Sequence, residues 1–365
     1  MARNKLLDVL LLLPISKMYA AVMAVRNKMF DWGILKSHSF DVPVVVVGNI
    51  SMGGTGKTPH VEYIVEQLRD KYHLGVLSRG YKRHTRGFVL AGSQSRPEDI
   101  GDESYQIYRK FGPDVTVAVC ESRVKGIKRM LEADPKIGMI ILDDAFQHRY
   151  VKPAVSIVLT EYSRPVFRDH VLPYGRLRES RSALDRADIV VVTKCPDDIK
   201  PMDFTLFKEN LNLYPYQRLY FSRYSYGSVV PVFPEEGAEI PNLDWTGADT
   251  HVLALTGVAN PKPFTRFLRS HRMKVRLCKF GDHHNFTASD MANIEERFDK
   301  LPGQKKYIFT TEKDAVRLFN NPYFPQRLKP YIFYVPIHVE FITETGTDFA
   351  PGIEKTLRNA KLFGS

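Results

Sequence analysis

Residues 44–58 read Val44-Val-Val-Val-Gly-Asn-Ile-Ser-Met-Gly-Gly-Thr-Gly-Lys-Thr58. The β-branched run at the start is typical of a buried strand in a parallel sheet, and residues 60–71 after it are predicted to form a helix. Glycines in the turn between them allow backbone N–H groups to point at phosphate oxygens, which the positive end of the helix also attracts. The segment therefore predicts a nucleotide-triphosphate site of the P-loop type, with Ser51 in place of the consensus opening glycine.

The residues of this loop have separate predicted roles. The Lys57 ammonium is expected to reach the β- and γ-phosphates, and the Thr58 hydroxyl is expected to bind Mg²⁺. The residues expected to contact the nucleotide are Ser51, Gly53, Gly54, Thr55, Gly56, Lys57 and Thr58.

A second apolar run, Ile137-Gly-Met-Ile-Ile-Leu142, ends in Asp143 and Asp144. Ligands of open α/β sheets collect at the carboxyl ends of the strands. An acid at that position can bind Mg²⁺ directly or through water. The alternative is that both aspartates only cap the following turn. Because the chain also contains Gly-Lys-Thr, we favour the metal role.

The composition favours an anionic partner and a reducing, cytosolic compartment. The 365 residues include 52 Lys+Arg and 41 Asp+Glu, a net charge of +11, which attracts nucleic acid, phosphorylated substrates and acidic membranes alike. The sequence has no helix-turn-helix, zinc-finger or aromatic RNA-binding signature, so we expect no nucleic acid. Its three cysteines are odd in number and widely spaced, which argues against a disulfide framework.

The first 40 residues are apolar and basic. Two hydrophobic runs, 9–15 and 18–25, are separated by Lys17, and neither reaches the roughly 18 apolar residues of a spanning helix. Six basic residues against two acidic ones favour an anionic lipid surface. We expect a helix lying in the membrane interface. A pair of ordinary core helices is the alternative; a secretory signal is rejected because export would separate the site from its nucleotide.

The rest of the chain predicts two α/β domains. Strands alternate with helices up to residue 215, which indicates a P-loop NTPase-like, doubly wound, mostly parallel sheet. Aromatic-rich strands then predict a β-ribbon linker, and a second α/β unit without a P-loop begins near Val252. The predicted organisation is a membrane-interface segment at 1–40, a P-loop domain at 41–215, the linker at 216–235 and a smaller α/β domain at 236–365.

Polar clusters that follow predicted strands are further candidates for chemistry. They are Asp102-Glu103, Gln147-His148 and Gly281-Asp-His-His-Asn-Phe286, with basic segments at 79–86 and 176–186. Each cluster also has a purely structural interpretation. Asp102 and Glu103 would stabilise the N-terminus of a helix through its dipole, and Gln147-His148 would form an ordinary polar turn. The third cluster would be a helix N-cap followed by solvated histidines. The basic segments suit recognition of a second phosphate.

Taken in order, these motifs resemble a known family. The matching segments are Gly48-Asn-Ile-Ser-x-Gly-Gly-Thr-Gly-Lys-Thr-Pro59, Ser78-Arg-Gly-Tyr81, Gly101-Asp-Glu103, Asp143-Asp-Ala-Phe-Gln-His148, Leu172-Pro-x-Gly-x-Leu-Arg-Glu179, Asp282-His-His284 and Thr311-Glu-Lys-Asp314. Across nearly its whole length the chain resembles tetraacyldisaccharide 4'-kinase, the lipid A kinase of Gram-negative bacteria. The resemblance implies transfer of the ATP γ-phosphate to the 4'-hydroxyl of a tetraacylated glucosamine disaccharide 1-phosphate. It also implies two α/β domains joined by a β-ribbon and an N-terminal helix on the cytoplasmic face of the inner membrane.

The resemblance also assigns roles to residues. Asp102 is expected to be the base near the attacking hydroxyl, paired with His283 of the second domain, with His284 as the alternative. That pairing requires the domains to close over ATP. Lys57 completes the catalytic set. The residues expected to contact the lipid substrate are Glu103, His148, Arg178 and Glu179. Residues 311–314 either contact the nucleotide or only brace the second domain, and we favour the structural role. We expect no obligate protein partner.

Two other functions fit the residues alone. A membrane-associated P-loop ATPase switch acting on a protein partner would use the same loop and N-terminus. The segment Val191-Val-Thr-Lys-Cys-Pro196 even resembles the base-reading segment of GTPases, but it lacks the aspartate that recognises guanine, which favours adenine. A P-loop kinase for a soluble metabolite is the second alternative, and the apolar N-terminus argues against it.

Overall fold

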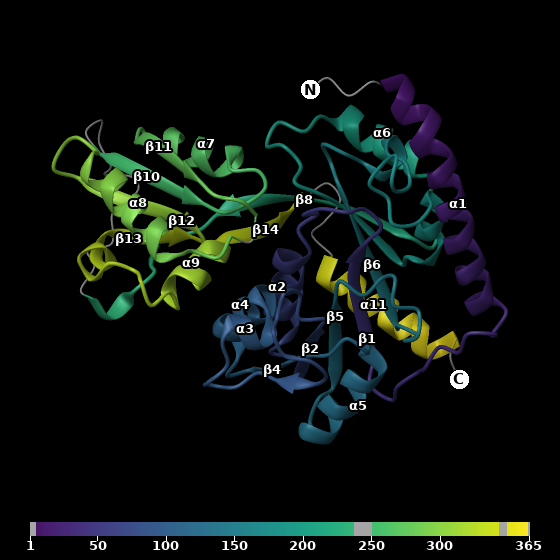
Figure 1. Ribbon diagram of the computed structural model, residues 1–365. Coiled ribbons are helices and arrows are strands. Elements are labelled where there is room, and N and C mark those ends of the chain that lie inside the picture. Colours follow the sequence, from purple (N-terminus) through teal and green to yellow (C-terminus); the bar gives the residue numbers. More distant parts are fainter. Residues whose placement is uncertain (1–4, 237–249, 283, 343–348, 364–365) are drawn as a thin grey trace.

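Two β-sheets organise the computed structural model, which describes residues 5–236, 250–282, 284–342 and 349–363; within these residues one sheet has nine strands and the other has five. Figure 1 shows the sheets in two lobes, with strands β8 and β14 running between them. The larger lobe contains the P-loop segment, and the smaller lobe contains the second α/β unit. The prediction of a large, mostly parallel sheet with a second, smaller α/β unit is confirmed.

The large sheet has the strand order β14-β8-β7-β6-β1-β5-β2-β4-β3. Its strands are β1 (Val44–Asn49), β2 (Leu74–Ser78), β3 (Val89–Leu90), β4 (Val115–Val119), β5 (Met139–Asp143), β6 (Val155–Glu161), β7 (Ile189–Thr193), β8 (Arg218–Tyr226) and β14 (Ile337–Phe341). Pairing is parallel from β8 to β4 and antiparallel where β14 and β3 join the two edges. The central strands are rich in buried β-branched residues, as expected for a parallel sheet covered on both faces.

Helices cover both faces of the large sheet. They are α2 (Lys57–Leu68), α3 (Pro97–Ile100), α4 (Asp102–Phe111), α5 (Arg123–Ala133), α6 (Pro201–Leu211) and α11 (Phe349–Phe363). Val44 and Val46 belong to a buried cluster that includes residues of α5 and α6, whereas Val45 and Val47 belong to another that includes residues of α2, α4 and α11. Successive residues of a strand point to opposite faces, so β1 is buried from both sides.

The smaller sheet has the order β11-β10-β12-β13-β9. Its strands are β9 (Val230–Pro231), β10 (His251–Thr256), β11 (Lys274–Lys279), β12 (Lys306–Thr311) and β13 (Ile332–Val335), and its helices are α7 (Lys262–Ser270), α8 (Ala288–Asp299) and α9 (Glu312–Phe319). All pairs are parallel except β13 with β9.

The ribbon between the lobes differs from the predicted linker at 216–235. That segment contributes one ribbon strand, β8, which pairs antiparallel with β14 so that Tyr224 lies opposite Val339. The other aromatic-rich stretch instead supplies β9 to the smaller sheet. The composition of the segment identified both strands, but the partner of β8 lies far along the chain, where no local pattern could indicate it.

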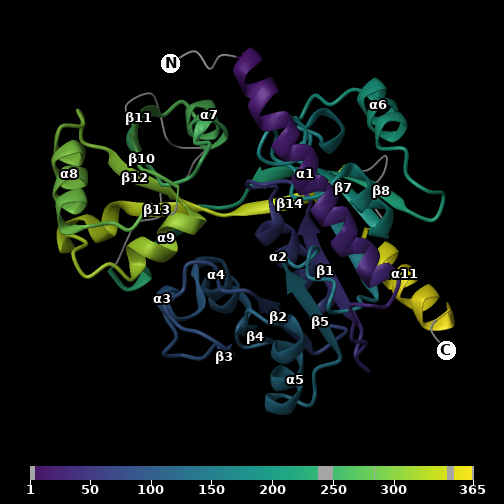
Figure 2. The ribbon, with the colours of Figure 1, turned by 45° about the vertical axis from the view of Figure 1, so that its right-hand side comes forward.

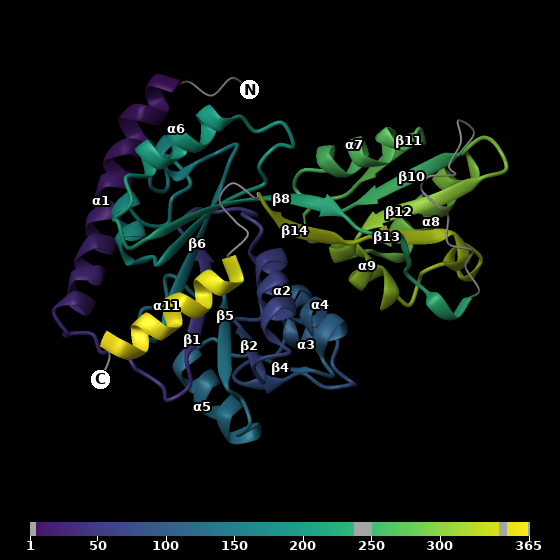
Figure 3. The ribbon, with the colours of Figure 1, turned by 180° about the vertical axis from the view of Figure 1, so that it is seen from behind.

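The end of the chain also differs from the predicted domain at 236–365. Helix α11 returns to the larger lobe, and Figure 3 shows it lying across that lobe. Phe349, Ile353 and Leu357 are buried there, at the spacing of one helix face. The Phe349 ring stacks on Phe341 of β14 with 4.0 Å between centroids. This contact anchors the ribbon where it re-enters the larger lobe.

The N-terminal segment forms a single long helix, α1 (Lys5–Asp31), with Pro14 inside it. Figure 2 shows α1 lying along the outside of the larger lobe. Ser16 and Phe30 are buried against the lobe. The opposite face carries exposed apolar side chains, which are Leu11, Ile15, Met18, Val22 and Val25.

Candidate active site

The loop between β1 and α2 has the conformation that its glycines permit. Gly56 precedes the first residue of α2 with φ 89°, and Gly53 has φ 117°. Glycine adopts such positive φ values without the steric cost that a Cβ would bring. The loop thus ends at the N-terminus of a twelve-residue helix, where backbone N–H groups without intrahelical partners favour an anion.

Side chains behind the loop hold its carbonyl groups. Thr193, at the end of β7, donates to the Thr55 carbonyl oxygen at 2.9 Å, and Lys194 donates to the Gly54 carbonyl oxygen. The Asn49 amide donates to the Thr55 hydroxyl at 2.7 Å. The segment that resembles a GTPase base-reading motif therefore supports the phosphate loop from behind, a role that the sequence did not indicate.

Asp143 is buried beside this loop without a partner for one oxygen. It ends β5 and lies opposite Val47 in the parallel register with β1. Its side chain is 1% exposed, and its Oδ1 has no hydrogen-bond partner among the residues that the structure describes. Burial, with the nearby Glu103 and Asp144 carboxylates, raises the pKa of Asp143 to about 7, against the opposing effect of Lys57. A bound cation would relieve this desolvated carboxyl group.

Asp144 lies close to two other residues singled out in the sequence. Its Oδ1 is 3.7 Å from the Lys57 Nζ and 3.3 Å from the Arg178 Nη1. Arg178 is placed by its backbone N–H, which donates to the Ile50 carbonyl oxygen at 2.7 Å. The basic segment at 176–186 therefore lies against the phosphate loop, as needed for a cation that contacts a phosphate.

Arg123 contacts both His148 and the backbone of Asp143. The Arg123 backbone N–H donates to His148 Nε2 at 3.3 Å, so the imidazole proton is assigned to Nδ1. Burial and the nearby arginines lower the pKa of His148 to about 4. The buried Arg123 guanidinium donates to the carbonyl oxygens of Cys120 and Asp143, at 2.9 and 3.2 Å. Sequence reasoning missed Arg123, although it follows β4 at the ligand-binding edge of the sheet.

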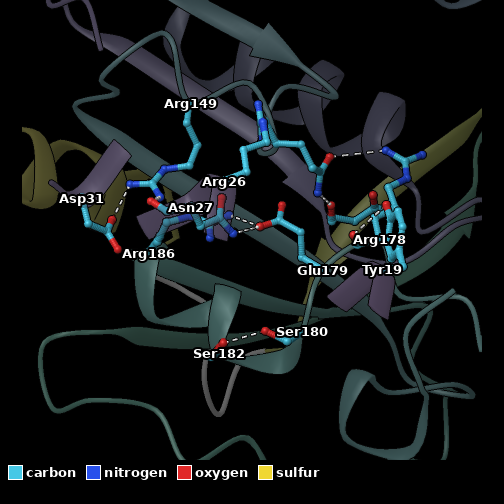
Figure 4. Close-up of polar contacts among 12 residues, drawn as sticks. Tyr19, Arg26, Asn27, Asp31, Arg149, Arg178, Glu179, Ser180, Ser182 and Arg186 are labelled. Carbon is cyan, nitrogen blue, oxygen red and sulfur yellow. Dashed lines mark hydrogen bonds and ion pairs between the residues drawn. The ribbon is translucent and has the colours of Figure 1, made fainter. Parts of the chain in front are cut away.

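Helix α1 reaches this region through its inner face, as Figure 4 shows. The Tyr19 hydroxyl donates to the Arg178 carbonyl oxygen at 3.2 Å. The buried Glu179 carboxylate accepts from the Asn27 amide at 2.8 Å and from the Arg186 guanidinium at 2.9 Å. Because Glu179 is 1% exposed, its carboxylate does not face solvent in this conformation.

The smaller lobe contacts the acids at the start of α4. The Arg317 guanidinium donates to Asp102 Oδ2, at 3.0 Å from its Nε, and it lies 3.3 Å from Asp314. Lys313 lies 3.9 Å from Glu103. Arg317 was not predicted from the sequence, although it lies one helical turn after Asp314 and therefore on the same face of α9.

The expected partner of Asp102, His283, lies outside the described residues. The alternative, His284, has its Nε2 2.9 Å from Asp290 at the start of α8 and stacks on Phe280. His284 is therefore engaged within its own lobe.

Residues 311–314 connect the smaller lobe internally and to the larger lobe. Asp314 is fully buried and accepts from the Gly257 backbone N–H and the Thr311 hydroxyl, at 2.8 and 2.7 Å. Glu312 is 3.6 Å from Lys110 of α4, which also pairs with Glu62 of α2 at 2.8 Å.

The fold and the site define a P-loop α/β protein, in which a phosphate loop, two adjacent carboxylates and a cross-lobe ion pair are built around one large sheet. The model of the tetraacyldisaccharide-1-P 4'-kinase family matches residues 9–357. The chain belongs to this family, which confirms the resemblance found in the sequence motifs.

Individual relatives agree with the family model. A tetraacyldisaccharide 4'-kinase of Bacteroides thetaiotaomicron is 52% identical over 337 residues, covering 91% of this chain and 88% of the relative. One of Flavobacterium johnsoniae is 42% identical, covering 91% and 92%. The crystal structure of LpxK from Aquifex aeolicus in complex with ATP superimposes with a TM-score of 0.72 at 27% identity, covering 94% of this chain and 98% of that one. The chain is an ATP-dependent phosphotransferase of lipid A biosynthesis.

Proposed function

We propose that the loop of residues 51–58 holds the phosphates of ATP and that the γ-phosphate passes to the 4'-hydroxyl of a tetraacyldisaccharide 1-phosphate. The observation that carries this proposal is the pair of acids beside the loop. Asp143 is buried, and the Asp144 carboxylate lies 3.7 Å from the Lys57 ammonium of the loop. The ATP in the crystal structure of the Aquifex aeolicus relative supports ATP as the nucleotide. Phosphoryl transfer needs mainly charge neutralisation and in-line placement, which such a cluster of charges can provide.

The residues at the loop suit Mg²⁺. Within the described ranges, no three His, Cys, Asp or Glu side chains gather as a metal site. The proposed donors are instead two carboxylates, those of Asp143 and Asp144, together with the Thr58 hydroxyl. These are hard oxygen donors of the kind that Mg²⁺ prefers, and Asp143 Oδ1 lacks a partner among the described residues. When bound, the ion supplies positive charge against the phosphates. Lys57 and Arg178, which pair with Asp144 in this structure, would bring two further positive charges to the phosphate oxygens.

Asp102 is the proposed base, with His283 as its proposed partner. The carboxylate would accept the proton of the attacking 4'-hydroxyl. Arg317 holds this carboxylate from the smaller lobe, so its orientation depends on how the two lobes meet. This dependence fits a reaction in which the lobes close over the nucleotide.

Substrate contacts are proposed for Glu103, His148 and Arg178. Arg178 offers a guanidinium that suits a phosphate group, and neutral His148 offers a hydrogen-bonding ring near the same acids. For Glu179 we propose an indirect contribution, since its carboxylate is buried and ties the loop that carries Arg178 to Asn27 of α1.

Helix α1 is the proposed membrane contact, on the cytoplasmic face of the inner membrane. By length and composition alone, residues Leu10–Asp31 could cross a membrane. However, one face of α1 is bonded to the larger lobe from Ser16 to Asn27, so lipid can cover only the other face. The exposed stripe of Leu11, Ile15, Met18, Val22 and Val25 follows helical spacing. An apolar stripe next to basic residues suits a helix that lies on an anionic surface.

Replacing Ile15, Met18 and Val22 together by serine is expected to weaken binding to anionic phospholipid vesicles by about 100-fold, because each apolar side chain removed loses about 1 kcal/mol of partial burial in the lipid. Vesicle flotation measures the partition. A matched control changes Leu277 and Tyr323, exposed apolar residues of the smaller lobe, and should float like the parent. Equal flotation of the stripe variant and the parent would exclude α1 as the contact.

The acceptor is tested by incubating the pure protein with Mg-ATP and a detergent-dispersed acylated disaccharide 1-phosphate. We expect ADP release that requires the lipid, with one phosphate found at the 4'-position for each ADP. Hydrolysis of ATP at the same rate without the lipid would instead support an ATPase switch. Turnover with a water-soluble acceptor only would support a kinase of soluble metabolites.

A further inference from the structure

His60 lies directly behind the phosphate loop, in the first turn of α2, and joins the loop to the ribbon between the lobes. Its Nδ1 is 2.7 Å from the Gly56 carbonyl oxygen, and its Nε2 is 2.9 Å from the Ser222 hydroxyl oxygen. Gly56 ends the phosphate loop, whereas Ser222 belongs to β8. Both His60 and Ser222 are buried, with 1% and 0% of their surface exposed.

The direction of these two hydrogen bonds follows from their chemistry. A carbonyl oxygen only accepts, so the His60 Nδ1 carries the ring proton and donates to Gly56. The Nε2 is then an acceptor, and the Ser222 hydroxyl donates to it. Burial lowers the pKa of His60 to about 4, which agrees with a neutral ring. The bridge from Ser222 through His60 to Gly56 therefore leaves no ring nitrogen unpaired.

Aromatic residues of both ribbon strands enclose this bridge. Tyr224 of β8 lies against Gly56, so closely that a Cβ on Gly56 would collide with the Tyr224 hydroxyl. The Phe341 ring of β14 meets the His60 ring edge to face, at 6.1 Å between centroids. A change in the path of the loop at Gly56 would therefore press on both strands of the ribbon.

One face of β8 continues this contact to the smaller lobe. Ser222, Tyr224 and Tyr226 alternate along the strand and so point to the same side. The Tyr226 ring stacks on Phe267 of α7, at 4.1 Å between centroids. A single strand face thus touches the phosphate loop at one end and the smaller lobe at the other. The smaller lobe in turn holds Asp102 through Arg317.

We propose that His60 is a positioning residue that sets the smaller lobe relative to the phosphate loop, so that occupancy of the loop is coupled to the placement of the cross-lobe groups at Asp102. The side chain is buried behind the loop and acts through the Gly56 carbonyl and the Ser222 hydroxyl. The proposal rests on the proposed ATP site at residues 51–58. It predicts that breaking the bridge impairs turnover more than nucleotide binding.

The test compares Ser222→Ala, His60→Phe and the double variant with Ser228→Ala, an exposed serine beyond the end of the same strand. Ser222→Ala removes a hydroxyl with little change of volume, and His60→Phe keeps a ring against Phe341. Affinity for a non-hydrolysable ATP analogue, kcat and the KM for the lipid acceptor are measured for each. Spin labels at Lys128→Cys on α5 and Ala292→Cys on α8, both exposed, report the distance between the lobes, since the three native cysteines are buried.

We expect Ser222→Ala to bind the analogue within about threefold of the parent and to lose about tenfold in kcat, the scale of one buried hydrogen bond. The analogue should narrow the distance distribution between the labels in the parent and in Ser228→Ala, but not in Ser222→Ala or His60→Phe. The double variant should resemble the single variants, since all of them break one bridge.

Three results would overturn the proposal: additive losses in the double variant, an unchanged kcat in Ser222→Ala, or label distances that respond to the analogue as in the parent. A fall in melting temperature together with equal losses of affinity and kcat would assign His60 a purely structural role. If the parent bound the analogue but lacked lipid-dependent transfer, the proposed function would fail while the distance measurement still tested the coupling.

Discussion

A Lys57→Ala variant is expected to lose at least about 10³-fold in kcat, because phosphoryl transfer depends on cationic groups placed at the transferring phosphate. The Lys57 ammonium lies 3.7 Å from Asp144 and is largely buried. Its removal also takes away a positive charge that lowers the pKa of Asp143. Transfer of radioactive phosphate from ATP to the lipid acceptor measures the loss.

The control for this variant is Lys71→Ala. Lys71 lies just beyond the end of α2 and pairs with Glu354 at the surface, where an ion pair contributes little to stability. This control should transfer phosphate at the rate of the parent. A Lys57→Ala protein as active as the parent would show that the loop does not hold the reacting phosphate.

Replacing Asp102 by alanine is the second change with a large expected effect. Loss of a general base costs about 10²- to 10⁴-fold in rate, so kcat should fall by that amount. Affinity for ATP should remain nearly that of the parent, because Asp102 begins α4 and is not part of the phosphate loop. Steady-state kinetics with the lipid acceptor and calorimetric titration with an ATP analogue separate the two quantities.

Two further variants distinguish the base from the contact between the lobes. Asp114→Ala removes an exposed acid that pairs with Arg69 and should behave like the parent. Arg317→Met removes the cation that holds Asp102 but keeps the carboxylate, so it should lose less in kcat than Asp102→Ala. Near-normal kcat in Asp102→Ala, or an equal loss in Arg317→Met, would refute the assignment of Asp102 as the base.

Local patterns in the sequence predicted much of the larger lobe. The two apolar runs singled out in the sequence, the one that begins at Val44 and the one that ends at Asp143, form strands β1 and β5, because each is a short run of buried apolar residues between breaks in the pattern. The pairing of β8 with β14 and the return of α11 were missed. Both depend on contacts between segments far apart in the chain. Neither the strand and helix propensities of the residues nor the spacing of apolar residues can indicate such contacts.

The candidate site shows the same division. Lys57, Asp144 and Arg178 were singled out from motifs, and the fold brings them together. Arg123 and Arg317 were missed because each is a basic residue in an amphipathic helix, a pattern that usually marks a solvated face. Only the tertiary structure shows that both guanidinium groups are buried against acids or carbonyl groups.

A cation and the tail of ATP are expected to meet between the phosphate loop and the paired acids. The most direct measurement is a crystal structure with a non-hydrolysable ATP analogue and Mn²⁺ in place of Mg²⁺, in which anomalous scattering locates the ion. We expect the ion on the Thr58 hydroxyl and on a carboxylate of Asp143 or Asp144, with the β- and γ-phosphates on the backbone N–H groups of residues 53–58. Phosphates bound elsewhere, or an ion without either carboxylate in its direct or water-bridged coordination, would contradict it.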